Sequence, residues 1–248
     1  MNALTVTPLS RERFFIVAVI VFIASVLATC ALHASMTSTT SMTGLSMPGG
    51  WTLSTTFSPM CGRTWLRAAA SFLGMWIAMM TAMMLPSFAP FLWRYRMQAP
   101  GAALMTAGYA FIWTTIGIAI FVLGALFTEL MLRAPAIARC VPVASGTLVL
   151  LAGAWQCSTW HARLLACCRH AKAQRNAWLD GVHHGLHCAL CCMAPTIALI
   201  VFGMMDLPAM ALVTLAISAE RLTRSQRPVT TRAIGVVLIA LGIVRLVA

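Results

Sequence analysis

The densest set of chemically active side chains lies in residues 183–192, where three histidines and three cysteines fall within ten positions. On a helix, residues three, four, seven and eight positions apart share one face. Five of the six have that spacing: His184, His187, Cys188, Cys191 and Cys192. Imidazole and thiolate together bind Zn(II), Cu(I) or an iron centre. We therefore predict a metal site on this helix, with His187 as a ligand or as a group that orients one.

A methionine run in residues 75–84 is the first candidate partner, because ligands on a single helix point the same way and cannot close a site alone. Met79 and Met83 lie four positions apart in one row, and Met80 and Met84 form another. A methionine stripe is also common as adaptable packing. As ligands, thioethers favour Cu(I) over Zn(II). We therefore predict Cu(I), with Met79, Met83 and Met84 as a soft entry or exit site.

A third group of candidate ligands follows the fourth apolar run of the chain. Its cysteines and histidines are Cys157, His161, Cys167, Cys168 and His170. A reducing cytosol would keep these cysteines as thiols, so a cytoplasmic loop could complete a site from below. The same segment also fits an ordinary positive loop. We take Cys167, Cys168 and His170, together with His183, as additional ligand candidates.

Other interpretations of these residues remain open. Cysteine in an apolar helix is usually a small hydrophobe, so the chain could be an accessory subunit in which Cys and Met only pack. It could also be a redox subunit of a larger membrane enzyme complex. Haem is disfavoured, because its two axial histidines usually come from different helices and the clustered histidines share one helix.

An enzyme is the less favoured interpretation. The chain has no nucleophile–base pair, no phosphate-binding loop and no HExxH motif. Asp206 and Glu220 bracket the sixth apolar segment, and acids in a membrane helix are functional suspects. Both are expected at helix ends, where solvation is easy. We interpret Glu220 beside Arg221 as a surface pair.

The composition requires that a membrane bundle position these residues. Hydrophobic residues make up 60% of the chain and charged residues only 9%, whereas a soluble domain has roughly 25% charged residues. A soluble domain and a disordered chain are both excluded. The charge of +12 comes from arginines at the ends of apolar runs, a topology signal rather than a nucleic-acid surface. We expect an all-α polytopic bundle in contact with lipid and no nucleic-acid partner.

Apolar runs of about 20 residues, the length that crosses a ~30 Å bilayer core, recur along the chain. We predict seven spans, or six if the short sixth is re-entrant: Phe14–Leu32, Trp65–Pro86, Leu104–Phe127, Val141–Trp160, Gly181–Met205, Leu207–Ala219 and Ala233–Val247. With the N-terminus inside, twelve basic residues lie on the cytoplasmic side and five outside, which favours that orientation. The Met and Cys/His stripes of the second and fifth spans then overlap in depth.

Two regions follow from this pattern. Residues 1–64 hold the first span and an extracytoplasmic loop rich in Ser, Thr and Met, and residues 65–248 form the metal-binding-type helical domain. The loop methionines are either Cu(I) collectors or incidental residues of a connector. A disulfide between Cys61 and either Cys30 or Cys140 is left open.

Three sequence blocks carry a family resemblance. The first is Trp76-x-x-Met79-x-x-Ala82-Met83-Met84-x-Pro86, and the second is Ala152-Gly153-x-Trp155-Gln156 followed by Cys168-Arg169. The third and most specific is His184-Gly185-Leu186-x-Cys188-x-x-Cys191-Cys192, which continues to Glu220. With these blocks the chain resembles a bacterial family of predicted metal-binding integral membrane proteins, a domain of unknown function. The resemblance implies an integral membrane protein that binds a metal. Taken with the Cys/His and Met residues, it favours a multi-pass inner-membrane protein that handles Cu(I) by transport, sequestration or delivery to a protein partner.

Overall fold

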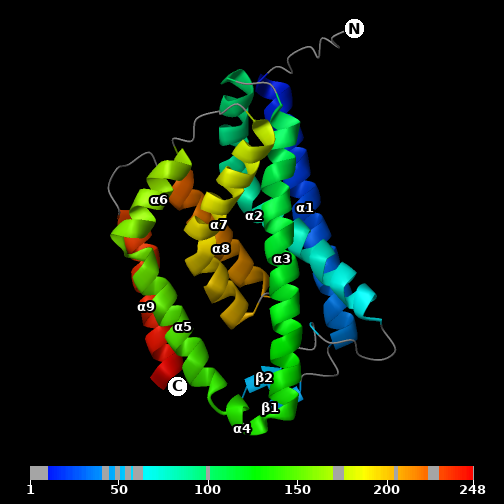
Figure 1. Cartoon of the computed structure of the whole chain (residues 1–248), viewed down its shortest axis with the longest axis vertical. Helices are drawn as coiled ribbons and strands as arrows, with labels where there is room; N and C mark the ends of the chain where they lie inside the picture. The colour runs from blue at the N-terminus through cyan, green and yellow to red at the C-terminus, as the bar shows by residue number, and fades with distance from the viewer. Residues whose placement is uncertain are drawn as a thin grey trace.

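The computed structural model of the protein is a bundle of helices with one small hairpin (Figure 1). It describes residues 11–40, 45–47, 51–53, 57, 64–98, 101–169, 176–203, 206–222 and 229–247. The helices in these residues are α1 (Arg11–Thr40), α2 (Trp65–Gln98), α3 (Ala102–Arg133), α4 (Pro135–Ala138), α5 (Val141–Gln156), α6 (Thr159–Arg169), α7 (Ala177–Phe202), α8 (Leu207–Leu222) and α9 (Val229–Val247). Between α1 and α2, strand β1 (Leu45–Met47) pairs antiparallel with β2 (Trp51–Leu53).

Five helices of the described chain are long and apolar enough to cross a membrane: α1, α2, α3, α7 and α9. Helices α5 and α6 pass the same test together, although they meet at a bend of 60°. The predicted sixth span is α8, whose 16 residues reach only about 24 Å. The helical bundle with apolar spans is as predicted. The described residues give five or six candidate spans, and the count of seven and the N-in orientation stay predictions.

Most predicted spans have different boundaries in the structure, and the second and third continue beyond their predicted ends, to Gln98 and Arg133. The fourth ends at Gln156, because Cys157 and Ser158 turn the chain, and the Ser158 hydroxyl then accepts the backbone N–H of His161 at 3.2 Å in the first turn of α6. The first continues to Thr40, so part of the stretch predicted as a loop is helical. Within this added part of the helix, Ser35 donates back to the carbonyl oxygen of Leu32 at 2.8 Å, a common arrangement for Ser and Thr in helices.

The long helices alternate in direction along the bundle (Figure 1). Helices α1, α3, α7 and α9 run one way, and α2, α5 and α8 run back. The start of α1, the end of α2, α6 and the start of α7 therefore share one end. The end of α3, the hairpin and the end of α9 share the other.

Helix α7 is central, because it packs against α3, α5, α6 and α8. Its contact with α3 depends on glycines, which have no side chain. A Cβ at Gly181 would collide with the backbone of Met105, and a Cβ at Gly108 would collide with the backbone of Trp178. Small residues permit such close approach between membrane helices, where packing itself holds neighbours together. This contact fixes α7 beside α3.

Helix α2 packs against α1, α3 and α8, and a hydrogen bond from a buried indole joins it to α3. The buried indole of Trp76 donates to the carbonyl oxygen of Trp113 at 2.9 Å. A Cβ at Gly117 would overlap that indole, so this glycine makes the room for it. Because α3 and α8 each touch both α2 and α7, they bring the methionines of α2 toward the cysteines of α7.

Candidate functional site

Three sulfur atoms from two helices converge inside the bundle. The Sδ of Met84 on α2 lies 3.9 Å from the Sγ of Cys188 and 3.9 Å from the Sγ of Cys192, both on α7. All three side chains are at most 2% exposed. We call Met84, Cys188 and Cys192 the sulfur cluster. The expectation that the two stripes overlap in depth is confirmed at these positions.

The spacing of the sulfur cluster fits a soft metal ion. Metal–thiolate bonds are about 2.3 Å long, so three sulfurs in a plane around one ion lie about 4.0 Å apart. The two separations from the Met84 sulfur are both 3.9 Å. Thiolate and thioether are the soft donors that Cu(I) prefers. The cluster therefore holds soft donors, and the two separations from the Met84 sulfur are compatible with donors around one ion.

Two polar groups from neighbouring helices touch the cluster. The hydroxyl oxygen of Tyr109 on α3 lies 3.0 Å from the Sγ of Cys188. The guanidinium of Arg221, near the end of α8, donates to the Sγ of Cys192 and to the carbonyl oxygen of Cys188, at 3.3 Å each. A hydroxyl donor and a cation are groups that stabilise negative charge on sulfur. A hydroxyl group thus lies beside the Cys188 sulfur and a positive charge beside the Cys192 sulfur.

His184 lies one helical turn before Cys188 and is buried in an aromatic pocket. Its ring stacks on Phe91 with centroids 3.9 Å apart, and the rings of Phe88 and Tyr109 lie 6.0 and 5.9 Å away. Across the described ranges, its Nδ1 has no hydrogen-bond partner. An orphaned buried nitrogen is costly, so this atom is an available ligand close to the sulfur cluster.

The other members of the predicted stripe differ in burial. His183 is exposed and His187 partly exposed, with their rings 4.2 Å apart and the Nδ1 of His187 2.9 Å from the carbonyl oxygen of His183. Cys191 is buried, as expected, and packs with Leu164 and Leu165 of α6. The stripe is therefore wider than the face that α7 buries. Metal binding by His183, His187 and Cys191 stays a prediction.

The predicted methionine site extends beyond the sulfur cluster. Met79 and Met83 are buried in the same apolar core as Met84. A cavity of about 200 Å³ lies between α1, α2 and α3, and its lining includes Met80, Met84 and Tyr109. Since Met84 and Tyr109 also contact Cys188, the cavity reaches the edge of the sulfur cluster.

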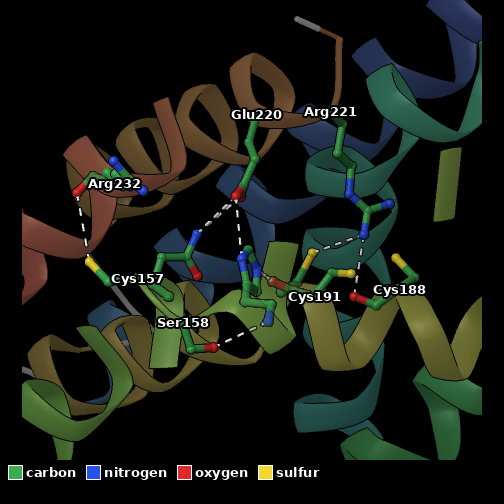
Figure 2. A network of polar contacts seen from close by, with 10 residues as sticks. Cys157, Ser158, Cys188, Cys191, Glu220, Arg221 and Arg232 are labelled. Atoms are coloured by element: carbon green, nitrogen blue, oxygen red, sulfur yellow. Dashed lines mark hydrogen bonds and ion pairs between the residues drawn. The ribbon is translucent and has the colours of Figure 1, made fainter. Parts of the chain in front are cut away.

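A second group of buried polar side chains joins α5, α6 and α8, and the sequence analysis did not predict it as a site. Gln156 donates from Nε2 to both carboxylate oxygens of Glu220 at 3.1 Å. His161 has its Nε2 3.0 Å from the carbonyl oxygen of Cys191 and its Nδ1 3.8 Å from the Oε1 of Glu220. We call Gln156, His161 and Glu220 the carboxylate cluster. Glu220 and Arg221, adjacent in the chain, turn toward different groups (Figure 2).

The interpretation of Glu220 as part of a surface pair is wrong. Its side chain is only 5% exposed, and Gln156 and His161 are fully buried. The reason is that α5, α6 and α7 cover the last turn of α8, so Glu220 is enclosed although it lies near the end of its helix. The signal that could have revealed this cluster is an ionisable residue beside a long apolar run, which is expensive in a membrane unless it is paired.

Several predicted ligands cannot be placed. His170 lies outside the described residues, and so do the side chains of Cys167 and Cys168. Cys61, on which both candidate disulfides depend, lies outside them as well. Of the loop methionines, Met47 is described, and it packs with Met131 and Ala138.

No group of three or more His, Cys, Asp or Glu side chains that could hold a metal ion is found in the part of the chain that the structure describes. The sulfur cluster contributes two cysteines, and its third donor is a methionine. A metal bound there would therefore depend on a thioether, or on a thioether and an imidazole. That donor set distinguishes the cluster from a typical structural zinc site of four Cys or His ligands.

A comparison with protein families also points to copper. The family model of PpoB2, described as a copper chaperone, matches residues 73–245, more than two thirds of the chain. The matched region contains the sulfur cluster, the carboxylate cluster and Arg221. No curated protein and no solved structure matches the chain.

Proposed function

This chain belongs to the PpoB2 copper chaperone family, and from that premise we propose that it carries Cu(I) in its sulfur cluster and passes the ion to a protein partner. Family membership and the apolar helices make it a copper-related membrane protein. The observation that carries the finer proposal is the convergence of three buried sulfurs with 3.9 Å spacings.

The ligands have distinct roles in this proposal. Cys188 and Cys192 bind as thiolates, and Met84 supplies a neutral third sulfur. His184 is one turn away, and its unpaired Nδ1 provides a further ligand when the ion shifts along α7. Cu(I) is favoured over Zn(II), because Zn(II) sites in proteins use Cys, His and carboxylate ligands rather than methionine.

A chaperone must release its cargo, and Met84 is the ligand suited to that step. A thioether is uncharged, so it holds Cu(I) less strongly than the two thiolates do. A thiolate from the partner can therefore replace Met84 first, while Cys188 and Cys192 still hold the ion. The buried Met79 and Met83 continue the row of soft donors along α2 and serve as entry or exit positions.

We place the protein in the bacterial inner membrane with its N-terminus in the cytoplasm. Arginines lie at the start of α1, near the end of α2 and in α6, and these segments share one end of the bundle (Figure 1). The positive-inside rule assigns such an end to the cytoplasm. The alternating helix directions then give seven passes if α8 and the bent α5–α6 pair each count as one.

The test is metal content after purification in detergent from copper-replete cells under reducing conditions. The wild-type protein should hold ~1 copper per chain by mass spectrometry, and the double variant Cys188→Ser with Cys192→Ser should lose it, because serine oxygen is a poor ligand for Cu(I). Cys157→Ser is the matched control, since Cys157 is exposed and its sulfur faces the Arg232 carbonyl of α9.

The outcomes separate the alternatives. Zinc or iron in place of copper would keep the site and reject the choice of metal. Equal copper in the wild type and the double variant would reject the sulfur cluster. The absence of any stoichiometric metal would favour a packing or accessory role. Membrane insertion of each variant, checked by fractionation, ensures that a loss of metal is not a loss of protein.

A further inference from the structure

His183 and His187 form a pair of imidazoles near the surface of α7, which we call the histidine pair. Their ring centroids lie 4.2 Å apart. His183 is exposed and His187 partly exposed, whereas the side chains of the sulfur cluster are at most 2% exposed. Residues four positions apart are neighbours on a helix surface, and this spacing lets two histidines of one helix bind one metal ion. The histidine pair is therefore a candidate metal site separate from the sulfur cluster.

A hydrogen bond to the backbone fixes which nitrogen of His187 can bind a metal. Its Nδ1 lies 2.9 Å from the carbonyl oxygen of His183. A carbonyl oxygen only accepts, so Nδ1 carries the hydrogen, and in the neutral ring the lone pair is on Nε2. Histidines that bind metals usually have their other nitrogen held in this way, often by a backbone carbonyl. His187 therefore has the tautomer of a ligand that binds through Nε2.

The histidine pair lies near the cytoplasmic edge of the membrane in the proposed topology. The hydroxyl of Tyr95, which lies between two arginines near the end of α2, donates to Asp180 in the first turn of α7 at 2.9 Å. This bond places the start of α7 level with arginines that mark the cytoplasmic side. His183 and His187 follow Asp180 by three and seven residues, about 4.5 and 10.5 Å along the helix. Cys192 lies deeper still.

The exposed side of α7 beside the histidine pair is otherwise apolar. Leu179, Leu186 and Leu190 are exposed there, and they face lipid in the proposed topology. Imidazole is poorly placed in such surroundings, because hydrocarbon offers its nitrogens no hydrogen bonds. An ionisable side chain in a membrane helix is a functional candidate by default. A metal ion bound by both rings supplies the partner that lipid cannot.

We propose that the histidine pair is a receiving site, which takes up Cu(I) at the cytoplasmic edge of the bundle and passes it to the sulfur cluster. The inference rests on the proposed function, in which the sulfur cluster holds the cargo. Imidazole is a suitable ligand for copper. Within the described ranges, no third His, Cys, Asp or Glu completes a group with the two rings. The receiving site therefore holds copper more weakly than two thiolates and a thioether do, as an intermediate site must.

His184 connects the receiving site to the sulfur cluster. It follows His183 in the chain and precedes Cys188 by one helical turn. Consecutive residues on a helix are turned by about 100°, so α7 passes from exposed rings to buried sulfurs over this short distance. The buried Nδ1 of His184, which has no hydrogen-bond partner in the described structure, lies on the way. In the transfer two Cu–N bonds break and two Cu–S bonds form, copper remains Cu(I), and the thiol protons of Cys188 and Cys192 pass to water.

The experiment separates the rate of copper loading from the affinity. The copper-free, detergent-purified chain is mixed with Cu(I) held by a soluble chelator under reducing conditions, and the ultraviolet absorbance of the Cu(I)–thiolate bonds is followed in a stopped-flow instrument. We expect His183→Gln with His187→Gln to slow loading about tenfold, because glutamine is a poor Cu(I) ligand. Since the sulfur cluster is intact, its Cu(I) affinity at equilibrium should change by less than about twofold. His33→Gln is the matched control, because His33 is a partly exposed histidine in the last third of α1.

The receiving site itself is measured where the sulfur cluster is disabled. In the double variant Cys188→Ser with Cys192→Ser, a competition titration should detect one weak Cu(I) site that purification strips. Replacing both histidines with glutamine in that background should weaken this residual binding at least about tenfold. Adding His33→Gln to the same background should leave it unchanged.

Each result has a defined meaning. An unchanged loading rate in the histidine variant overturns the inference. A rate that falls only as far as the affinity does also overturns it, because the histidines then merely support the sulfur cluster. Residual binding in the cysteine double variant that does not depend on the histidines overturns it as well. Tight copper retained in the cysteine double variant rejects the proposed function, whereas its loss together with an unchanged loading rate in the histidine variant rejects only the receiving site.

Discussion

Two buried clusters, the carboxylate cluster and the sulfur cluster, are contacted by adjacent residues of α8 but differ in the atoms that they present. Glu220 belongs to the carboxylate cluster, and Arg221 touches the sulfur cluster. Consecutive residues on a helix are turned by about 100°, so Glu220 and Arg221 point in different directions. Glu220 lies among hard oxygen and nitrogen atoms that form hydrogen bonds. Arg221 is a cation beside the three soft sulfur atoms of the sulfur cluster.

The difference separates a structural role from the binding role that we propose. The carboxylate cluster connects Gln156 of α5, His161 of α6, the Cys191 carbonyl of α7 and Glu220 of α8. Its atoms are directional partners of one another, so its main effect is to hold four helices together. The sulfur cluster has looser contacts of 3.9 Å, and its sulfurs are free to exchange a weak contact for a metal bond.

The largest expected effect is on stability, from Glu220→Ala. This change leaves the buried amide of Gln156 without its acceptor and removes the carboxylate near His161. We expect a loss of about 2–4 kcal/mol in the free energy of unfolding, since unsatisfied buried polar groups cost 1–3 kcal/mol each. Unfolding in detergent, followed by circular dichroism, measures it.

The control for that comparison is Glu129→Ala. Glu129 forms an exposed pair with Arg133 one turn away at 2.7 Å, and such a pair contributes at most ~0.5 kcal/mol. If the two alanine variants unfold alike, the carboxylate cluster is not a helix clamp. If Glu220→Ala instead loses bound copper at an unchanged stability, the division of roles between the two clusters is reversed.

The next effect is on metal affinity, from Met84→Leu. Leucine nearly conserves the volume, so stability should change by less than about 1.5 kcal/mol. The third sulfur is lost, however, and we expect Cu(I) affinity to fall about tenfold. Met80→Leu is the matched control, because Met80 is equally buried and lines the same cavity. Equal affinities in the two variants would show that Met84 only packs.

A smaller effect is expected from Tyr109→Phe. The variant keeps the ring stacked on Phe88, with centroids 4.3 Å apart, and removes the hydroxyl 3.0 Å from the Cys188 sulfur. One lost hydrogen bond contributes about 1 kcal/mol, so Cu(I) affinity should fall three- to tenfold. A competition titration with a Cu(I) chelator resolves this range. An increase in affinity would mean that the hydroxyl hinders metal binding.

Much of the sulfur cluster could be predicted from the sequence, because its signals are local. The spacing of Cys188 and Cys192 places them on one face of a helix, and Met84 follows the same rule on α2. Counting residues from the ends of the spans gave the correct relative depth. What the sequence could not supply is which helices are neighbours. That depends on close contacts such as Gly181 against Met105, which involve residues far apart in the chain.

The carboxylate cluster could not be predicted in the same way. Gln156, His161 and Glu220 lie on three helices, and no periodic pattern connects them. The bend of 60° between α5 and α6 is what brings His161 back toward α7. A sliding estimate of hydrophobicity treats the two helices as one span and misses this turn. The same estimate puts Glu220 at the end of a separate apolar segment, α8, and does not show that α5 and α6 cover it.

The smallest expected effect is from Cys191→Ala, and it tests whether the cysteines of α7 are equivalent. The sequence analysis took Cys191 as a ligand together with Cys188 and Cys192. In the structure its side chain packs with Leu164 and Leu165, and its carbonyl oxygen, which the variant keeps, is the partner of His161. We expect less than a twofold change in Cu(I) affinity and a stability loss near 1 kcal/mol, measured beside Cys188→Ala, which should abolish stoichiometric binding. If Cys191→Ala and Cys188→Ala lose copper equally, the metal site extends across α7 to the carboxylate cluster, and the two regions act as one.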